Sequence, residues 1–105
     1  MTGGQSTRDD NDPPVRLHVM VDGRVQGVGF RYFVAENALA LGLTGWVRNR
    51  WNGAVEVVAE GKRAALEMLL SALQRGPRSA FVTDVSQQWL PATGEFSSFR
   101  VRPTE

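Results

Sequence analysis

The apolar residues of this chain switch between two spacings, and the order of the switches limits the fold more than any other feature. In residues 15–21, every second residue from Leu17 to Val21 is apolar, which predicts a half-buried strand. In residues 30–41, apolar residues recur three or four apart, which predicts a helix that stops at Gly42. The same patterns return later and predict strands over 43–50, 54–60 and 80–89 (Phe81 and Val85 on one face), a helix over 62–75 and a short edge strand over 99–102.

This order, β-α-β-β-α-β with a short C-terminal addition, predicts a ferredoxin-like two-layer α+β sandwich. Right-handed crossovers place both helices on one face of an antiparallel sheet. Asn52 and Gly53 predict a tight turn between the second and third strands, because both residues tolerate positive φ. We expect one domain over residues 15–103, preceded by a disordered tail over residues 1–14. Such a fold carries many activities, so the function has to be argued from the site.

The composition excludes several classes of function. The 105 residues include no cysteine and one histidine, His18, so neither thiolate nor multi-histidine metal sites are expected. Twelve basic and eleven acidic residues give a net charge of +1. This charge is too close to neutral for a protein that binds nucleic acid by neutralising its phosphates. No apolar run approaches the ~20 residues of a membrane span, and no signal-peptide pattern is present. We therefore expect a cytoplasmic monomer without a metal or cofactor, a membrane partner or a nucleic-acid partner.

Residues 23–31, Gly-Arg-Val-Gln-Gly-Val-Gly-Phe-Arg, connect the first predicted strand to the first predicted helix. A loop rich in glycine at this place directs backbone N–H groups toward a common point, and Arg31 lies in the first turn of the helix. A cation is unfavourable there, because a helix N-terminus already carries roughly half a positive charge. The arrangement is favourable when an anion lies between the helix N-terminus and the guanidinium of Arg31. Phosphate suits this place, because backbone N–H groups and arginine both bind its oxygens.

Three nucleotide-binding interpretations fit the loop less well. The phosphate-binding loop of nucleotide hydrolases needs a lysine, and the loop holds none. The dinucleotide-binding pattern needs a small residue three positions after Gly29, where Tyr32 stands. RNA-recognition domains share the predicted fold and present aromatic residues on the two central strands. The corresponding residues 17–20 and 55–58 include no aromatic residue, so RNA binding remains only an alternative.

Two long motifs resemble those of the acylphosphatases. The first is the loop at residues 23–31. The second is Leu-Gly-Leu-Thr-Gly-Trp-Val-Arg-Asn at residues 41–49, followed by Asn-Gly-Ala-Val-Glu at residues 52–56. Ala59-Glu60-Gly61, Gly76-Pro77 and Phe99-Arg100-Val101-Arg102 match later landmarks, so the resemblance covers residues 15–103. It implies hydrolysis of acyl phosphates to a carboxylate and inorganic phosphate by direct attack of water.

The resemblance also implies a role for particular residues. Arg31 binds the phosphoryl oxygens, and Asn49 orients the attacking water. The phosphate site consists of Val25, Gln26, Gly27, Val28, Gly29, Phe30 and Arg31, through the loop amides and the guanidinium. The implied substrate is a small-molecule acyl phosphate, with inorganic phosphate as product and competitive inhibitor. Trp51, beside a turn that reads Asp-Gly in many family members, is a candidate contact for the acyl group.

Acyl phosphate chemistry needs few groups. The leaving carboxylate has a conjugate acid with a pKa near ~4, so no general acid is required. Amides and one guanidinium stabilise the charge on the phosphoryl oxygens, and an asparagine oxygen can orient water without taking its proton. His18 is expected to be structural, because it lies on the strand face opposite Leu17. Arg24, Arg48 and Arg50 are expected to be solvated charges.

The alternative is a non-catalytic phosphate-binding or regulatory module. The same domain occurs within larger maturation proteins that handle carbamoyl phosphate. The chain ends soon after residue 103, which favours a free enzyme over such a module.

Overall fold

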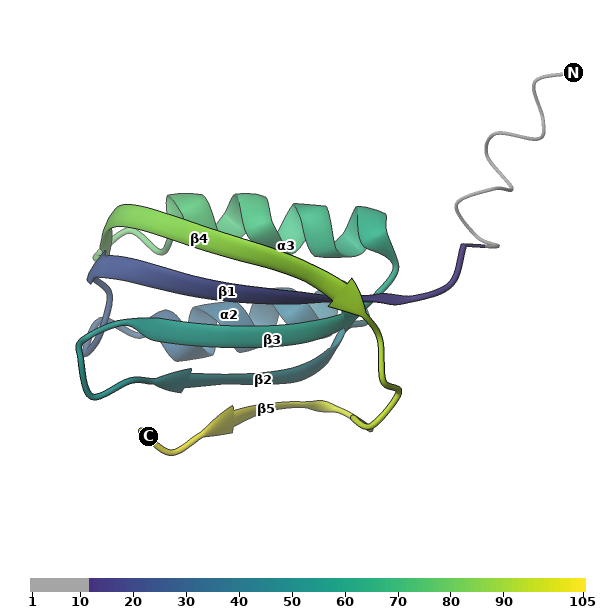
Figure 1. Cartoon of the computed structure of the whole chain (residues 1–105). Coiled ribbons are helices and arrows are strands. Elements are labelled where there is room, and N and C mark those ends of the chain that lie inside the picture. Colours follow the sequence, from purple (N-terminus) through teal and green to yellow (C-terminus); the bar gives the residue numbers. More distant parts are fainter. Residues whose placement is uncertain (1–11) are drawn as a thin grey trace, which may run out of the picture.

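The computed structural model describes residues 12–105, and most of the predicted tail over residues 1–14 lies outside this range. Two helices cover one face of a five-stranded sheet with the strand order β4-β1-β3-β2-β5 (Figure 1). The elements are β1 (Val15–Arg24), α2 (Phe30–Ala40), β2 (Thr44–Asn49), β3 (Val55–Gly61), α3 (Arg63–Arg75), β4 (Phe81–Pro91) and β5 (Phe99–Arg102). The ferredoxin-like prediction is therefore confirmed. The strands β4, β1, β3 and β2 are antiparallel to their neighbours, whereas β5 adds to β2 in parallel, so the sheet is mixed.

The core lies between the sheet and the two helices. Leu17, Val19 and Val21 of β1 are fully buried, as their alternation predicts. On α3 the completely buried residues Leu66, Leu69 and Leu73 recur at helical spacing, and Leu70 is partly buried. On α2 the buried residues are Phe30, Val34 and Ala38, which recur at helical spacing. Burial of these side chains provides most of the stabilisation, and it fixes the helices against the sheet.

The first strand is longer than the sequence predicts, and the loop is shorter. β1 continues to Arg24 because it still pairs with β4, with Gly23 opposite Val82 and Arg24 opposite Phe81. Thr83 has no partner in this register, so it forms a bulge that shifts the alternation of β4 by one residue. Val82 therefore packs against the core with Val85, while Phe81 is 67% exposed. The prediction that Phe81 and Val85 share one face is wrong for this reason.

The hairpin between β2 and β3 is closed by a loop of residues 51–53. The backbone N–H of Arg50 donates to the carbonyl of Ala54 at 2.8 Å, and the N–H of Gly53 donates to the carbonyl of Arg50 at 3.1 Å. Gly53 has a positive φ of 96°, but no described residue other than glycine has a positive φ. The predicted tight turn is present, and in this three-residue loop Gly53 alone takes a left-handed position while Asn52 does not.

The outer face of the sheet, opposite the helices, carries a network of ion pairs. Glu56 accepts hydrogen bonds from Nε2 of His18 at 2.7 Å and Nε of Arg48 at 2.9 Å, and Arg50 approaches it at 3.4 Å. Burial raises the pKa of Glu56, but the hydrogen bonds from His18 and Arg48 outweigh it and lower that pKa below its usual value. The structural role of His18 is confirmed. Arg48, which also pairs with Glu105, and Arg50 are not simply solvated.

Glu60 anchors the connection between β4 and β5 to this face. Its carboxylate, 4% exposed, accepts from Nε of Arg16 at 2.7 Å and from the backbone N–H groups of Thr93 at 2.9 Å and Gly94 at 3.0 Å. Burial raises the pKa of Glu60, but these backbone and side-chain donors reverse the effect and hold its pKa below the usual value. Glu60 is therefore stabilised as a carboxylate.

The lowered pKa of Glu60 predicts how the free energy of unfolding depends on pH. The carboxylate stabilises the fold above the pKa that it has in the unfolded chain, and this contribution is lost as the pH falls through the folded-state pKa. We expect Glu60→Gln to lower the free energy of unfolding near neutral pH by about 1–3 kcal/mol, and the difference from the wild type to shrink in acid. Urea unfolding across the acid range measures this. Glu67→Gln, at an exposed position of α3, is the control. A difference that stays constant down to strongly acidic pH would contradict the assignment.

Candidate functional site

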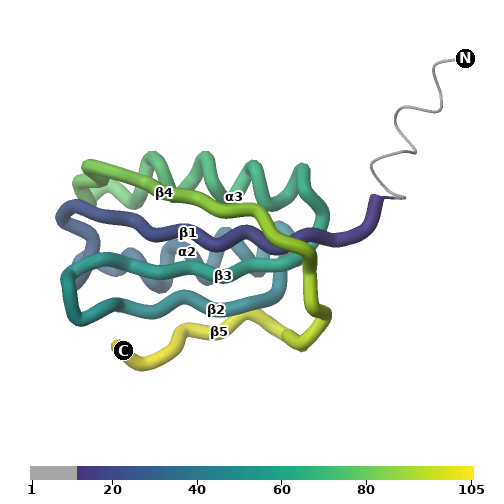
Figure 2. The backbone as a smooth tube through the Cα atoms, viewed as in Figure 1, coloured from purple at the N-terminus to yellow at the C-terminus, as the bar shows by residue number. Residues whose placement is uncertain are grey.

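The pairing of β3 brings the glycine-rich loop and Asn49 to one end of the sheet. Both β1 and β2 are antiparallel to β3, so they run in the same direction and end at the same edge. The loop after β1 and the hairpin after β2 therefore lie next to each other, as the chain trace shows (Figure 2). Asn49, the last residue of β2, is placed beside the start of α2 although about twenty positions separate them in sequence.

A pocket of about 230 Å³ occupies this position. Its lining consists of Val25, Gly27, Gly29, Phe30, Arg31, Tyr32 and Asn49. The structure thus brings together the two predicted catalytic residues and much of the predicted phosphate loop. Gln26 and Val28 do not line the pocket. Tyr32 does, although the sequence singled it out only as an obstacle to dinucleotide binding.

Two left-handed glycines give the loop its shape. Gly27 has a φ of 74° and Gly29 a φ of 78°, a conformation that glycine adopts without strain. Residues of left-handed conformation within such a loop turn successive N–H groups toward one side and form an anion-binding concavity. Gly29 also caps α2 without a side-chain acceptor, and the first turn of α2 contains no acidic residue. The N–H groups of that turn are therefore unpaired within the helix and available to an anion.

Arg31 adds a second positive group to the same pocket. It lies half-buried in the first turn of α2, and within residues 12–105 no ion pair involves it. A guanidinium beside a helix N-terminus is repelled when no anion is present. Among groups that relieve this repulsion, a phosphoryl group matches the planar fork of arginine.

Asn49 presents an unpaired acceptor. Its Oδ1 atom is buried and has no hydrogen-bond partner among the described residues. An unpaired buried acceptor costs about 1–3 kcal/mol, so its presence calls for a donor that residues 12–105 do not supply. Because Asn49 lines the pocket, a water molecule there could donate this hydrogen bond.

The loop is held by side-chain hydrogen bonds that the sequence did not reveal. Nε2 of Gln26 donates to the carbonyl oxygens of Arg50 at 2.7 Å and Ala54 at 2.8 Å, which joins the loop to the hairpin. Oγ of Ser79 donates to the carbonyl of Val28 at 3.1 Å. These bonds fix the loop relative to Asn49. No spacing rule links a glutamine in one loop to two carbonyls in another, so only the structure shows them.

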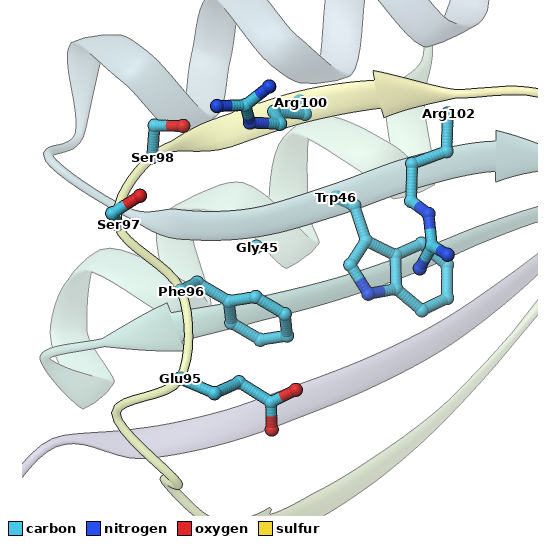
Figure 3. Close-up of a pocket in the computed structure, with 8 residues that line it drawn as sticks. All are labelled: Gly45, Trp46, Glu95, Phe96, Ser97, Ser98, Arg100 and Arg102. Carbon is cyan, nitrogen blue, oxygen red and sulfur yellow. The ribbon is translucent and has the colours of Figure 1, made fainter.

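A second hollow, of about 270 Å³, lies beside β5 and shares no residue with the pocket at Arg31 (Figure 3). Trp46 and Phe96 line it, and the guanidinium of Arg102 lies 4.9 Å from the centre of the Trp46 ring. Arg48 lies 4.5 Å from the same ring. The contact from Arg102 joins β5 to β2, whereas Arg48 and Trp46 both belong to β2.

Residues 17–101 match the family model for acylphosphatases. The chain belongs to the acylphosphatase family. It is 52% identical to the acylphosphatase of Moorella thermoacetica over 88 residues, which cover 84% of this chain and 94% of the relative. The crystal structure of an acylphosphatase from Bacillus subtilis superposes with a TM-score of 0.81 at 41% identity, covering 84% of this chain and 98% of that one. An acylphosphatase from Coxiella burnetii gives a TM-score of 0.81 at 39% identity, covering 97% and 100%.

The family assignment makes this acylphosphatase a hydrolase that acts on acid anhydrides. The described part of the acylphosphatase contains no group of three or more His, Cys, Asp or Glu residues that could hold a metal ion. Within the same residues, neither helix has the length and apolar character that crossing a bilayer demands.

Removal of the side-chain hydrogen bonds of Gln26 is expected to loosen the glycine-rich loop. Gln26→Ala removes two side-chain hydrogen bonds to carbonyls that keep their backbone donors. We expect the free energy of unfolding to fall by about 1–3 kcal/mol, at about 0.5–1.5 kcal/mol for each lost bond. We also expect a higher KM for acyl phosphate, because the loop is no longer held in its binding conformation. Urea unfolding and steady-state kinetics measure the two effects. Gln87→Ala, at an exposed glutamine of β4, is the control. Unchanged stability and KM would show that the bonds from Gln26 do not hold the loop.

Proposed function

We propose that this acylphosphatase hydrolyses the carboxyl-phosphate anhydride of small acyl phosphates in the pocket at Arg31, by direct attack of a positioned water. One observation carries the proposal: a guanidinium, left-handed glycines at a helix N-terminus and an unpaired asparagine oxygen line the same pocket. The products are a carboxylate and inorganic phosphate. Phosphate, which occupies the same groups as the substrate, is expected to inhibit competitively.

The phosphoryl group is bound by the loop and by Arg31. Backbone N–H groups between Val25 and Phe30 and the forked guanidinium approach its non-bridging oxygens. Negative charge on these oxygens is redistributed in the transition state, and fixed donors stabilise it without reorganisation. Because Gln26 and Ser79 hold the loop in place, the donors are oriented before the substrate binds.

Asn49 positions the nucleophile. Oδ1 accepts a hydrogen bond from a water molecule and so directs the water oxygen toward phosphorus. The oxygen–phosphorus bond forms as the bond between phosphorus and the acyl oxygen breaks, and the electron pair of that bond leaves with the carboxylate. The proton released from the water passes to solvent or to the phosphate product, since an amide is too weak a base to keep it.

The competing hypotheses are less well supported. On the outer face of the central strands β1 and β3, the positions that an RNA base would stack on hold no aromatic residue, and Glu56 and Glu60 lie there. A non-catalytic module would bind phosphate but not turn over acyl phosphate. A monomeric state is part of this proposal. A cytoplasmic location is part of the same proposal.

Removal of the guanidinium tests the site directly. We expect Arg31→Ala to lower kcat/KM for an acyl phosphate by ~10³ or more, as when a transition-state arginine is lost. Arg31→Lys should restore little, because an ammonium cannot form the two parallel hydrogen bonds. Arg63→Ala is the matched control, since Arg63 also begins a helix but pairs with Glu67. Near-normal turnover by Arg31→Ala would overturn the assignment of the pocket as the active site.

Asn49→Ala separates water positioning from phosphate binding. We expect kcat to fall by about 10²-fold, the effect of misplacing a reacting group, while the inhibition constant of inorganic phosphate stays close to that of the wild type. Stability should be unchanged or higher, because the substitution removes an unpaired buried oxygen. Loss of phosphate binding with kcat preserved would assign Asn49 to the phosphate instead.

A further inference from the structure

The residues that line the catalytic pocket differ in their exposure. Val25 and Phe30 are each 1% exposed and form its base. Gly27, Gly29 and Tyr32 are exposed and form what we call the rim. Two of these three have no side chain, so the phenol ring of Tyr32, 67% exposed, is the side chain that the rim presents.

The chemistry of the proposed reaction determines where the acyl group leaves the pocket. In phosphoryl transfer the attacking and leaving oxygens lie roughly in line through phosphorus. The water is held by Asn49, which belongs to the sheet, so the carboxylate departs on the side away from Asn49. Tyr32 belongs to α2, which lies in the helix layer (Figure 1). An acyl group that extends away from Asn49 therefore passes the rim on the side of Tyr32.

We propose that Tyr32 forms an acyl-group subsite, where its ring packs against a flat, apolar acyl group of the substrate. This inference rests on the proposed function and deepens it by naming a substrate class: aryl acyl phosphates are preferred over acetyl phosphate. A ring that packs face to face or edge to face with another aromatic ring gains stabilisation beyond the area that it buries. Acetyl phosphate has no group that reaches this contact, whereas benzoyl phosphate does.

Other exposed rings at this end of the molecule do not take this position. Trp51, 82% exposed, follows β2, and Phe81, 67% exposed, begins β4, but neither lines the pocket. The contact between Trp51 and the acyl group that the sequence suggested is therefore less favoured than a contact with Tyr32.

The test compares kcat/KM for benzoyl phosphate and acetyl phosphate in the same enzyme preparations. The ratio of the two values isolates recognition of the acyl group, because both substrates share the phosphoryl site. We expect Tyr32→Ala to lower this ratio by about threefold to tenfold, and Tyr32→Phe to keep it. Leu39→Ala, at an exposed apolar residue of the same helix, is the matched control and should leave the ratio unchanged.

Each outcome has a defined meaning. An unchanged ratio in Tyr32→Ala overturns the subsite, and so does a ratio that falls as far in Tyr32→Phe, because the hydroxyl would then be responsible. A fall in Trp51→Ala without one in Tyr32→Ala would move the subsite to the hairpin and also overturn the proposal. Failure of the proposed function looks different: the wild type would hydrolyse neither substrate, or Arg31→Ala would retain its activity.

Discussion

The antiparallel pairing of β3 with both of its neighbours is the constraint on which the site depends. It makes β1 and β2 end at the same end of the sheet, and the last pair of β2 with β3 is Asn49 opposite Val55. The loop after β1 and Asn49 at the end of β2 are then neighbours by topology. The bonds from Gln26 to the carbonyls of the hairpin refine this arrangement, because they fix the distance between two loops that the strands only bring near each other.

The charged groups on the outer face of the sheet are paired, whereas the polar groups of the pocket at the end of the sheet are not. On the outer face, Glu56 and Glu60 are each surrounded by donors, and their pKa values are held below the usual value despite burial. In the pocket, Arg31 lies beside a helix N-terminus without a carboxylate in that turn, and Asn49 has an unpaired oxygen. The protein therefore satisfies its charges where they stabilise the fold and leaves polar groups unpaired where a ligand is bound. Such local deficits are characteristic of binding sites, where stability and function compete.

The sequence predicts the order of elements and two residues, Arg31 and Asn49, that the structure places in one pocket, but it does not predict particular non-local features. Period and turn signals are local, so the bounds of α2 and α3 are predicted to within about one residue, within the precision with which helix ends are defined. The bulge at Thr83, which exposes Phe81, depends on the register of β1 against β4 and has no local signal. The parallel addition of β5 and the bonds of Gln26 are of the same kind. Arg31 and Asn49 are predicted because they belong to long motifs, and the structure places both in one pocket. The motifs imply no role for Tyr32, and only the pocket shows that it lies beside them.

The exposure of Tyr32 follows from the geometry that makes the site work. The base of the pocket is occupied by Val25 and Phe30, which are also core residues, so the pocket cannot deepen without disturbing the packing that holds α2 against the sheet. In the proposed reaction a pocket of about 230 Å³ holds the phosphoryl group, and the acyl group lies toward the surface. Recognition of that group can then come only from the rim, where glycines required for left-handed backbone leave no side chain. Tyr32 lines the pocket and lies outside the core, so its side chain can contact an acyl group without a change in the packing of α2.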